Sequence, residues 1–194
     1  MVKLIGFKKI NLAVFISGKG SNLKNLIDFT FTKKSKFQIR FIISNNAKAK
    51  GLKFAKKFKI QKKIISFQNT RKAESQILKI IKKKKINLIC LAGFMKILSK
   101  SFIKNFKGKI INIHPSLLPK YKGLNTHERV IKNKEKFSGC TVHFVNSKLD
   151  SGKIILQKKI KIKKNDTSKS LAKKILKQEH ILYKKALNKI HSKL

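Results

Sequence analysis

The polar residues of the segment NIHPSLLP, residues 112–119, have the types and spacing that acyl-transfer chemistry needs. An imidazole moves a proton near neutral pH, and a side-chain amide donates a hydrogen bond to an oxygen that gains negative charge. Asn112 and His114 are two residues apart, so a β-strand would direct both side chains to one face. Pro115 and Pro119, both prolines of the chain, stiffen the backbone that follows. The segment either presents a catalytic pair or holds a structural histidine and a capping asparagine.

Carboxylates are rare in this chain, which contains seven of them, so each one is informative. Asp150 lies in the polar turn NSKLDSG, residues 146–152, where an aspartate commonly forms the turn. Close to His114, its carboxylate would stabilise the imidazolium and orient the ring. His143 fits a buried structural role as well as a role in the site. Glu179 could receive an amine substrate, although an exposed position on a helix is the default expectation.

The turn SGKGSN, residues 17–22, separates an expected strand from an expected helix. Its glycines permit close approach of an anion, and the start of a helix presents free N–H groups to a phosphate. The turn lacks the GxGxxG spacing and no acidic residue ends the second expected strand, so a dinucleotide is not expected. Phosphate binding and a plain strand-to-helix connection are the two interpretations.

Several other reaction classes lack their residues in this sequence. The histidines are scattered, with no HExxH and no Cys/His cluster, so no metal site is expected. No GxSxG elbow for a serine nucleophile occurs either. Cys90 and Cys140 have no CxxC spacing and are expected to be small core residues in a reducing cytoplasm. We therefore expect a metal-free reaction whose nucleophile belongs to a substrate.

Alternating apolar runs predict the elements that must position these residues. Strands are expected at residues 10–17, 37–44, 63–67, 86–93 and 109–114, with helices between them at 23–29, 47–58, 71–84 and 99–106. Apolar strands that alternate with helices predict a mostly parallel sheet with helices on both faces. Ligands of such sheets bind at the carboxyl ends of the strands. Four segments meet at that edge: 17–22, 93–98, 112–119 and 146–152.

The C-terminal part has a different pattern. Strands at 141–145 and 153–162 have no helix between them, which predicts an antiparallel extension of the sheet. A last helix is expected over 167–190, with good N-cap residues from Asp166 onward. Its expected buried stripe contains Leu171, Ile175, Ile181, Leu182 and Leu187. No linker or repeat interrupts the chain, so residues 1–194 are expected to form a single α/β domain with its core at about residues 10–190.

The net charge of +43 would normally suggest a nucleic-acid-binding protein. Only three basic residues are arginines, which read bases and phosphates best, and the lysines are spread along the whole chain. Lys, Ile, Asn and Phe have A/T-rich codons, so codon bias explains the charge better than a specific partner does. We expect weak, salt-dependent and non-specific binding of polyanions.

No membrane contact is expected, because no apolar run reaches the roughly 18 residues that a membrane-spanning helix needs. The basic and apolar start of the chain has some features of a signal peptide. Its apolar stretch leads straight into the turn at 17–22, so we expect a retained strand and a cytoplasmic protein.

The motifs ISGKGSN, LAGFMKILS, INIHPSLLPKYKG, GCTVHFV and LDSGKIILQ, in this order and spacing, resemble the phosphoribosylglycinamide formyltransferase family. The resemblance runs from about residue 10 to about residue 190. HPSLLP is typical of all folate-dependent formyltransferases, whereas the GSN turn is typical of members that act on glycinamide ribonucleotide. The resemblance implies a Rossmann-like formyltransferase fold. It also implies transfer of a formyl group from 10-formyltetrahydrofolate, as co-substrate, to the amine of glycinamide ribonucleotide in purine biosynthesis.

The resemblance implies roles for single residues as well. Asn112, His114 and Asp150 match the catalytic trio of the family, which stabilises an oxyanion and relays a proton. Ribonucleotide-binding positions of the family are matched by Gly20, Ser21, Asn22 and Glu179. Folate-binding positions are matched by Arg71, Met95, Lys96, Ile97, Leu98 and Asn112. Thr141 is expected to help position this network. The implied partners are small-molecule substrates, and the enzyme is expected to be a monomer or a homodimer without a metal.

Two other readings compete with this one. Methionyl-tRNA formyltransferase and formyltetrahydrofolate hydrolase share the core, but each normally carries an additional domain for which this chain is expected to have no room. A basic nucleic-acid-binding protein on the same scaffold would explain the charge. It would not explain why the trio and the phosphate turn occur together, and no aromatic stacking platform is evident.

Overall fold

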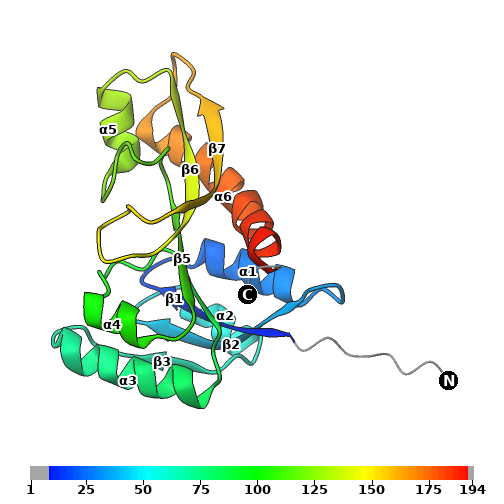
Figure 1. Ribbon diagram of the computed structural model, residues 1–194. Helices are drawn as coiled ribbons and strands as arrows, with labels where there is room; N and C mark the ends of the chain where they lie inside the picture. Colours follow the sequence, from blue (N-terminus) through cyan, green and yellow to red (C-terminus); the bar gives the residue numbers. More distant parts are fainter. Residues whose placement is uncertain (1–8, 192–194) are drawn as a thin grey trace.

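The computed structural model describes residues 9–191, which form one mixed sheet with helices on both faces (Figure 1). Residues 1–8 and 192–194, at the ends of the expected domain, lie outside the described residues. The strands are β1 (Ile10–Ile16), β2 (Phe37–Ser44), β3 (Lys62–Ile64), β4 (Leu88–Leu91), β5 (Lys109–His114), β6 (Phe137–Phe144) and β7 (Ile154–Lys161). The helices are α1 (Ser21–Thr30), α2 (Leu52–Lys57), α3 (Thr70–Lys83), α4 (Lys100–Asn105), α5 (Thr126–Lys132) and α6 (Ser168–His191).

The strand order in the sheet is β3-β2-β1-β4-β5-β6-β7. The first five strands pair in parallel, whereas β6 pairs antiparallel with β5 and β7 antiparallel with β6. This confirms the predicted parallel sheet and its antiparallel extension. The chain runs outward from β1 to β3 and then returns to place β4 on the other side of β1, so the strand order reverses between β1 and β4. Such a switch point opens a crevice at the carboxyl ends of the strands.

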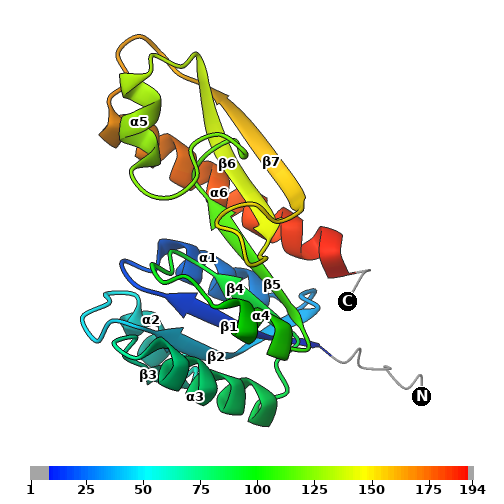
Figure 2. The same cartoon turned by 60° about the vertical axis from the view of Figure 1, so that its left-hand side comes forward.

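Two apolar cores lie on opposite faces of the sheet. Residues of α1, α2, α5 and α6 pack with one set of inward-facing strand side chains, and residues of α3 and α4 pack with the other. In Figure 2, α6 lies along β6 and β7, while α3 lies at the bottom of the view, on the opposite side of the parallel strands from α1. The central parallel strands β1 and β4 are therefore covered on both sides, which explains their apolar sequences, whereas the edge strand β3 is exposed.

Some expected elements differ from the structure. Helix α5 was not predicted, because its short sequence places only Thr126 and Val130 in the interior. Strand β6 begins at Phe137, four residues before the expected start at residue 141. In α6, Ile181 is exposed rather than part of the buried stripe, since 100° per residue turns it away from the face that buries Glu179 and Ala186. Among residues 9–191, no helix is long and apolar enough to cross a membrane.

Candidate active site

A cavity of about 1380 Å³ lies at the carboxyl ends of β1, β4 and β5. Its wall contains the four segments that were expected to meet there: residues 17–22, 93–98, 112–115 of the histidine loop, and 146–150 of the aspartate turn. Residues of α6, including Glu179, complete it. The prediction that these distant segments converge on one edge of the sheet is confirmed.

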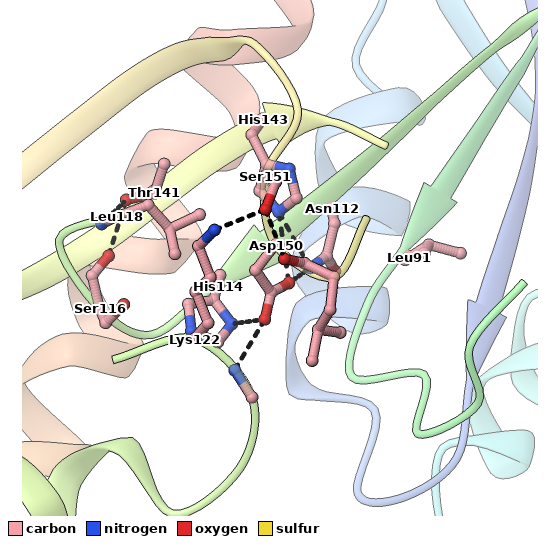
Figure 3. Close-up of polar contacts among 12 residues, drawn as sticks. Leu91, Asn112, His114, Ser116, Leu118, Lys122, Thr141, His143, Asp150 and Ser151 are labelled. Carbon is pink, nitrogen blue, oxygen red and sulfur yellow. Dashed lines mark hydrogen bonds and ion pairs between the residues drawn. The ribbon is translucent and has the colours of Figure 1, made fainter. Parts of the chain in front are cut away.

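His114, at the end of β5, lies beside Asp150 (Figure 3). Nδ1 of His114 is 3.4 Å from Oδ2 of Asp150, and both side chains are more than nine-tenths buried. Nε2 of His114 is 2.8 Å from the backbone oxygen of Tyr121. Because a carbonyl oxygen only accepts, Nε2 must carry a proton, so a neutral ring would turn a lone pair of Nδ1 toward the carboxylate. The two contacts therefore favour the imidazolium.

Burial and these contacts act on the two ionisable groups in opposite directions. Burial lowers the pKa of His114, while the Tyr121 carbonyl and the Asp150 carboxylate raise it; the pKa stays below its usual value. Burial also raises the pKa of Asp150, but contacts with His143, the Gly123 amide and His114 outweigh it and hold the pKa below its usual value. Asp150 is therefore ionised at neutral pH beside an imidazole poised to gain a proton as negative charge develops nearby.

Asn112 lies in the same strand as His114 and faces the same pocket. Its Nδ2 lies 3.3 Å from Nε2 of His143 and 3.5 Å from Oδ1 of Asp150. Nδ1 of His143 lies 2.8 Å from the backbone oxygen of Phe144, so Nε2 can accept from the amide. The antiparallel register pairs Asn112 with His143, and this pairing brings His143 into the site. Both contacts of the amide are long, so its N–H groups can turn to a stronger acceptor.

Thr141 holds the loop after β5 rather than the charged residues. Its hydroxyl donates to the Ser116 carbonyl at 2.7 Å and accepts from the Leu118 amide at 3.2 Å. Gln157 of β7 donates to the same hydroxyl and to the Leu118 carbonyl. The expected role of Thr141 in positioning the network is therefore carried by the loop that leads away from His114.

Gly20 ends the turn after β1 and precedes helix α1. Its φ of 76° lies in the left-handed region that glycine adopts without strain. No side chain caps α1 and no acidic residue lies in its first turn, so the N–H groups that begin the helix have no competing carboxylate. The turn and these N–H groups border the cavity and form a place for an anion.

Gly20→Ala is expected to lower the melting temperature and to raise KM for a phosphorylated substrate. A Cβ at this position would lie 2.5 Å from the backbone Cα of Gly51, and the left-handed backbone would add strain. Relief of the contact must move the turn that faces the cavity. Thermal unfolding and steady-state kinetics measure both effects, with Lys56→Ala, at an exposed position of α2 outside the cavity wall, as the control. An unaltered KM in Gly20→Ala would place the anion elsewhere.

Glu179 of α6 is buried at the cavity wall, which overturns the default expectation of an exposed helix residue. Burial raises its pKa to about 7, and the hydrogen bond from Nδ2 of Asn22, at 2.8 Å, opposes this rise. Oδ1 of Asn22 is also buried, and no partner within the protein satisfies it. The pair joins the turn after β1 to α6 and leaves polar atoms for a ligand.

The segment after β4 supplies an apolar edge to the cavity. Leu98 is buried, whereas Met95 and Ile97 are 61% and 69% exposed. Leu124 and Leu149, also largely exposed, lie in the same wall. Exposed apolar side chains gathered around one cavity are typical of a site for a flat or apolar ligand. Lys96 lies between them on the wall.

Arg71 is not brought into this cavity. It is exposed in the first turn of α3 and is absent from the residues of the wall. A smaller cavity of about 590 Å³, lined by Gln68 and Lys96 among others, lies between the start of α3 and the segment after β4. The assignment of Arg71 to the folate site thus has less geometric support than that of the other expected folate-binding residues.

The loop 121–125 was missed by the sequence reasoning. Gly123 donates its backbone N–H to Oδ2 of Asp150 at 2.9 Å, and Tyr121 contributes the carbonyl beside His114. A backbone contact leaves no residue-type signal. The Gly-Leu-Asn turn before Thr126 was the one available sign of a helix start. Among residues 9–191, no cluster of three or more His, Cys, Asp or Glu side chains could hold a metal ion.

Comparisons with known proteins agree with this geometry. The sequence pattern of the formyl transferase family matches residues 10–187. The chain is 38% identical over 177 residues to phosphoribosylglycinamide formyltransferase of Escherichia coli, a match that covers 90% of this chain and 84% of that protein. The crystal structure of phosphoribosylglycinamide formyltransferase from Brucella melitensis is 39% identical, superposes with a TM-score of 0.89, and covers 94% of this chain and 96% of that one.

A longer relative shares the same region. The trifunctional purine biosynthetic protein adenosine-3 of Homo sapiens is 42% identical over 188 residues, which are 95% of this chain but 19% of that protein. The chain thus spans about a fifth of the length of this relative. With the family pattern, the Escherichia coli relative and the Brucella melitensis structure in agreement, the chain belongs to the formyl transferase family, in its phosphoribosylglycinamide formyltransferase branch.

Proposed function

We propose that this formyltransferase transfers the formyl group of 10-formyltetrahydrofolate to the amine of glycinamide ribonucleotide, a step of purine biosynthesis. The observation that carries the proposal is the group formed by Asn112, His114 and Asp150 on the wall of one large cavity. The names of the relatives supply the acceptor, the resemblance of the sequence motifs supplies the folate donor, and the cavity offers the side chains that transfer between them needs.

The substrates divide the cavity between them. The turn Gly20–Asn22 and the start of α1 receive the phosphate, and Glu179 with Asn22 meets the glycinamide end. The segment Met95–Leu98 receives the folate, since its exposed apolar side chains suit a ring system. Asn112, at the junction of the two regions, faces the carbon that is transferred. Arg71, which lies outside the cavity wall, would contact only the outer end of the folate.

The reaction needs no nucleophile from the protein. The amine nitrogen forms a bond to the formyl carbon, and the bond from that carbon to the folate nitrogen breaks. Asn112 Nδ2 donates a hydrogen bond to the oxygen that becomes negative in between, and the imidazolium of His114 stabilises that charge. Asp150 stabilises the imidazolium and relays the proton that the amine loses toward the departing nitrogen, directly or through a water molecule.

Chelators are expected to leave the rate unchanged, because every step in this mechanism uses a donor, a carboxylate or a substrate group. Turnover after dialysis against EDTA should equal turnover before it. Loss of activity that added Zn²⁺ or Mg²⁺ restores would contradict the mechanism. A second sample treated with EDTA already saturated with Ca²⁺ controls for effects of the chelator itself.

The decisive experiment is a formyl-transfer assay at moderate salt. The protein is mixed with both substrates, and formation of formylglycinamide ribonucleotide is followed together with release of tetrahydrofolate. Equal amounts of the two products, each dependent on both substrates, would support the proposal. Folded protein that gives no product would overturn it, and methionyl-tRNA would be the next acceptor to try.

The setting of the reaction is also part of the proposal. We expect the enzyme to work in the cytoplasm as a monomer or homodimer on small molecules, with weak non-specific binding of polyanions. Sedimentation across a range of protein concentrations measures the assembly state. Binding to unrelated RNA and DNA sequences at several salt concentrations tests the non-specific polyanion binding. Purely electrostatic binding falls steeply with salt and does not depend on sequence.

A further inference from the structure

The loop 121–125 touches both members of the charged pair through its backbone. The Tyr121 carbonyl lies 2.8 Å from Nε2 of His114, and the Gly123 N–H donates to Oδ2 of Asp150 at 2.9 Å. Movement of this loop would change the protonation of His114 and the orientation of the Asp150 carboxylate. Whatever fixes the loop therefore acts on the site without contacting a substrate.

The backbone of this loop is strained. Tyr121, Gly123 and Asn125 have φ angles of 55°, 78° and 54°. The left-handed region is easy for glycine, tolerated by asparagine and uncommon for a bulky aromatic residue such as Tyr121. Such a conformation persists only where surrounding contacts determine it. The left-handed backbone at Tyr121 thus requires contacts from outside the loop.

The side chain of Tyr121 is fixed on the far side from the cavity. Its hydroxyl donates to Oε1 of Glu135 at 2.9 Å and accepts from Nδ2 of Asn133 at 3.0 Å. These two contacts fix the start of the loop. They do not reach Gly123 or the residues on either side of it.

Arg129 of α5 reaches those residues. Its Nη1 donates to the Lys122 carbonyl at 2.7 Å and lies 3.4 Å from the Leu124 carbonyl, so one nitrogen bridges the two neighbours of Gly123. The guanidinium carbon also lies 5.3 Å from the centre of the Tyr121 ring. Planar stacking combined with several donors is a property of guanidinium that an ammonium group lacks.

The composition makes this placement unusual. The chain carries 50 basic residues, of which Arg40, Arg71 and Arg129 are the arginines. Arg129 contacts two backbone carbonyls of one loop through a single nitrogen, whereas Lys189 donates to one backbone carbonyl, that of Ile155, and Lys24, Lys120 and Lys174 pair with carboxylates. A surface charge that only maintained solubility would not need these contacts.

We infer that Arg129 is a positioning residue for formyl transfer, which holds the loop 121–125 so that its backbone aligns His114 and Asp150. This rests on the proposed function, because it assigns the chemistry to those two side chains. The positive charge of Arg129 does not itself promote formyl transfer. It lowers the pKa of His114, so removal of the charge alone would favour the imidazolium. A slower reaction without Arg129 must therefore come from its lost contacts.

The test replaces Arg129 by methionine, which keeps a long apolar stem but donates no hydrogen bond. Arg129→Met is expected to lower kcat by about ten- to a hundred-fold, the loss that a displacement of about 1 Å causes. KM for both substrates should change by no more than about twofold, as expected for contacts that matter in the transition state. The kcat of Arg129→Lys should fall between those of the wild type and Arg129→Met, because lysine keeps a hydrogen-bond donor but lacks the planar guanidinium group.

Amide hydrogen exchange gives a readout that is independent of activity. In Arg129→Met, the Gly123 amide should exchange faster, while the Ile42 amide, which bonds to the Gln61 carbonyl in the sheet, should keep its wild-type rate. Arg40→Met, at an exposed position on β2, is the matched control and should equal the wild type in every measurement. Faster exchange at both amides would mean general destabilisation and would overturn the inference.

Failure of this inference and failure of the proposed function give different results. Full activity in Arg129→Met, or an unchanged Gly123 exchange rate despite a lower kcat, would overturn the positioning role. His114→Ala is measured in the same assay. An active His114→Ala variant would overturn the proposed function, whereas an inactive one beside a fully active Arg129→Met would overturn only the role of Arg129.

Discussion

Replacing His114 by alanine is expected to lower kcat by about 10²–10⁴-fold, the usual contribution of a positioned acid–base group. The ring is buried, its Nε2 is committed to the Tyr121 carbonyl, and its Nδ1 is directed at Asp150. His143 contacts the opposite oxygen of the carboxylate, so it does not occupy the position of the His114 ring. Single-turnover measurements with both substrates report the chemical step, and equilibrium binding of the folate should be nearly unaffected.

His180→Ala is the matched control for this variant. His180 lies in α6, half-buried and outside the cavity wall, so its loss removes a similar volume without touching the reaction. Its kcat should equal that of the wild type. Wild-type turnover in His114→Ala would remove the proposed mechanism, and equal losses in the two variants would point to a general loss of folded protein.

Asp150→Asn is expected to lower kcat by about 10²–10³-fold, because the variant keeps the shape of the side chain and loses its charge. The backbone should accept the change: Asp150 has a φ of 44°, and asparagine is among the residues that tolerate this region. Alanine would add strain to the loss of charge and confuse the two effects. Circular dichroism and thermal unfolding should show a folded variant before its kinetics are interpreted.

The pH dependence of this variant has a definite sign. The Asp150 carboxylate raises the pKa of His114, so asparagine lowers that pKa further and leaves less imidazolium at any given pH. The decline of kcat with rising pH should therefore begin at lower pH than in the wild type. Asp28→Asn, at an exposed ion pair of α1, should show the wild-type profile. If the pH dependence of kcat in Asp150→Asn equals that of the wild type, the carboxylate does not act through His114.

The central parallel strands could be predicted because they are short and mostly apolar, whereas the exposed edge strand β3, Lys62–Ile64, overlaps only the start of the expected strand at 63–67. Strands β1 and β5 occur where their sequences place them, to within a residue. The N-cap of α6 is also as expected, with Thr167 and Ser170 bonded reciprocally at its start. Local chemistry was sufficient for these features, since each depends on a few neighbouring residues.

The features of the site that could not be predicted from the sequence depend on contacts between distant residues. Alternation along β6 could not distinguish a structural His143 from a site residue, because the answer lies in its pairing with Asn112 across the sheet. Glu179 looks like a surface residue until the turn after β1 covers it. The placement of Arg71 rested on resemblance alone, and the described geometry leaves it outside the cavity.

The pairing of β5 with β6 places Asn112 opposite His143 and His114 opposite Thr141. A slip by one residue would turn every side chain of one strand to the other face. The site therefore forms only when the two strands pair in this register. Anyone who grafts this site onto another scaffold must therefore transplant both strands as one unit, with their alignment intact, and not the single residues.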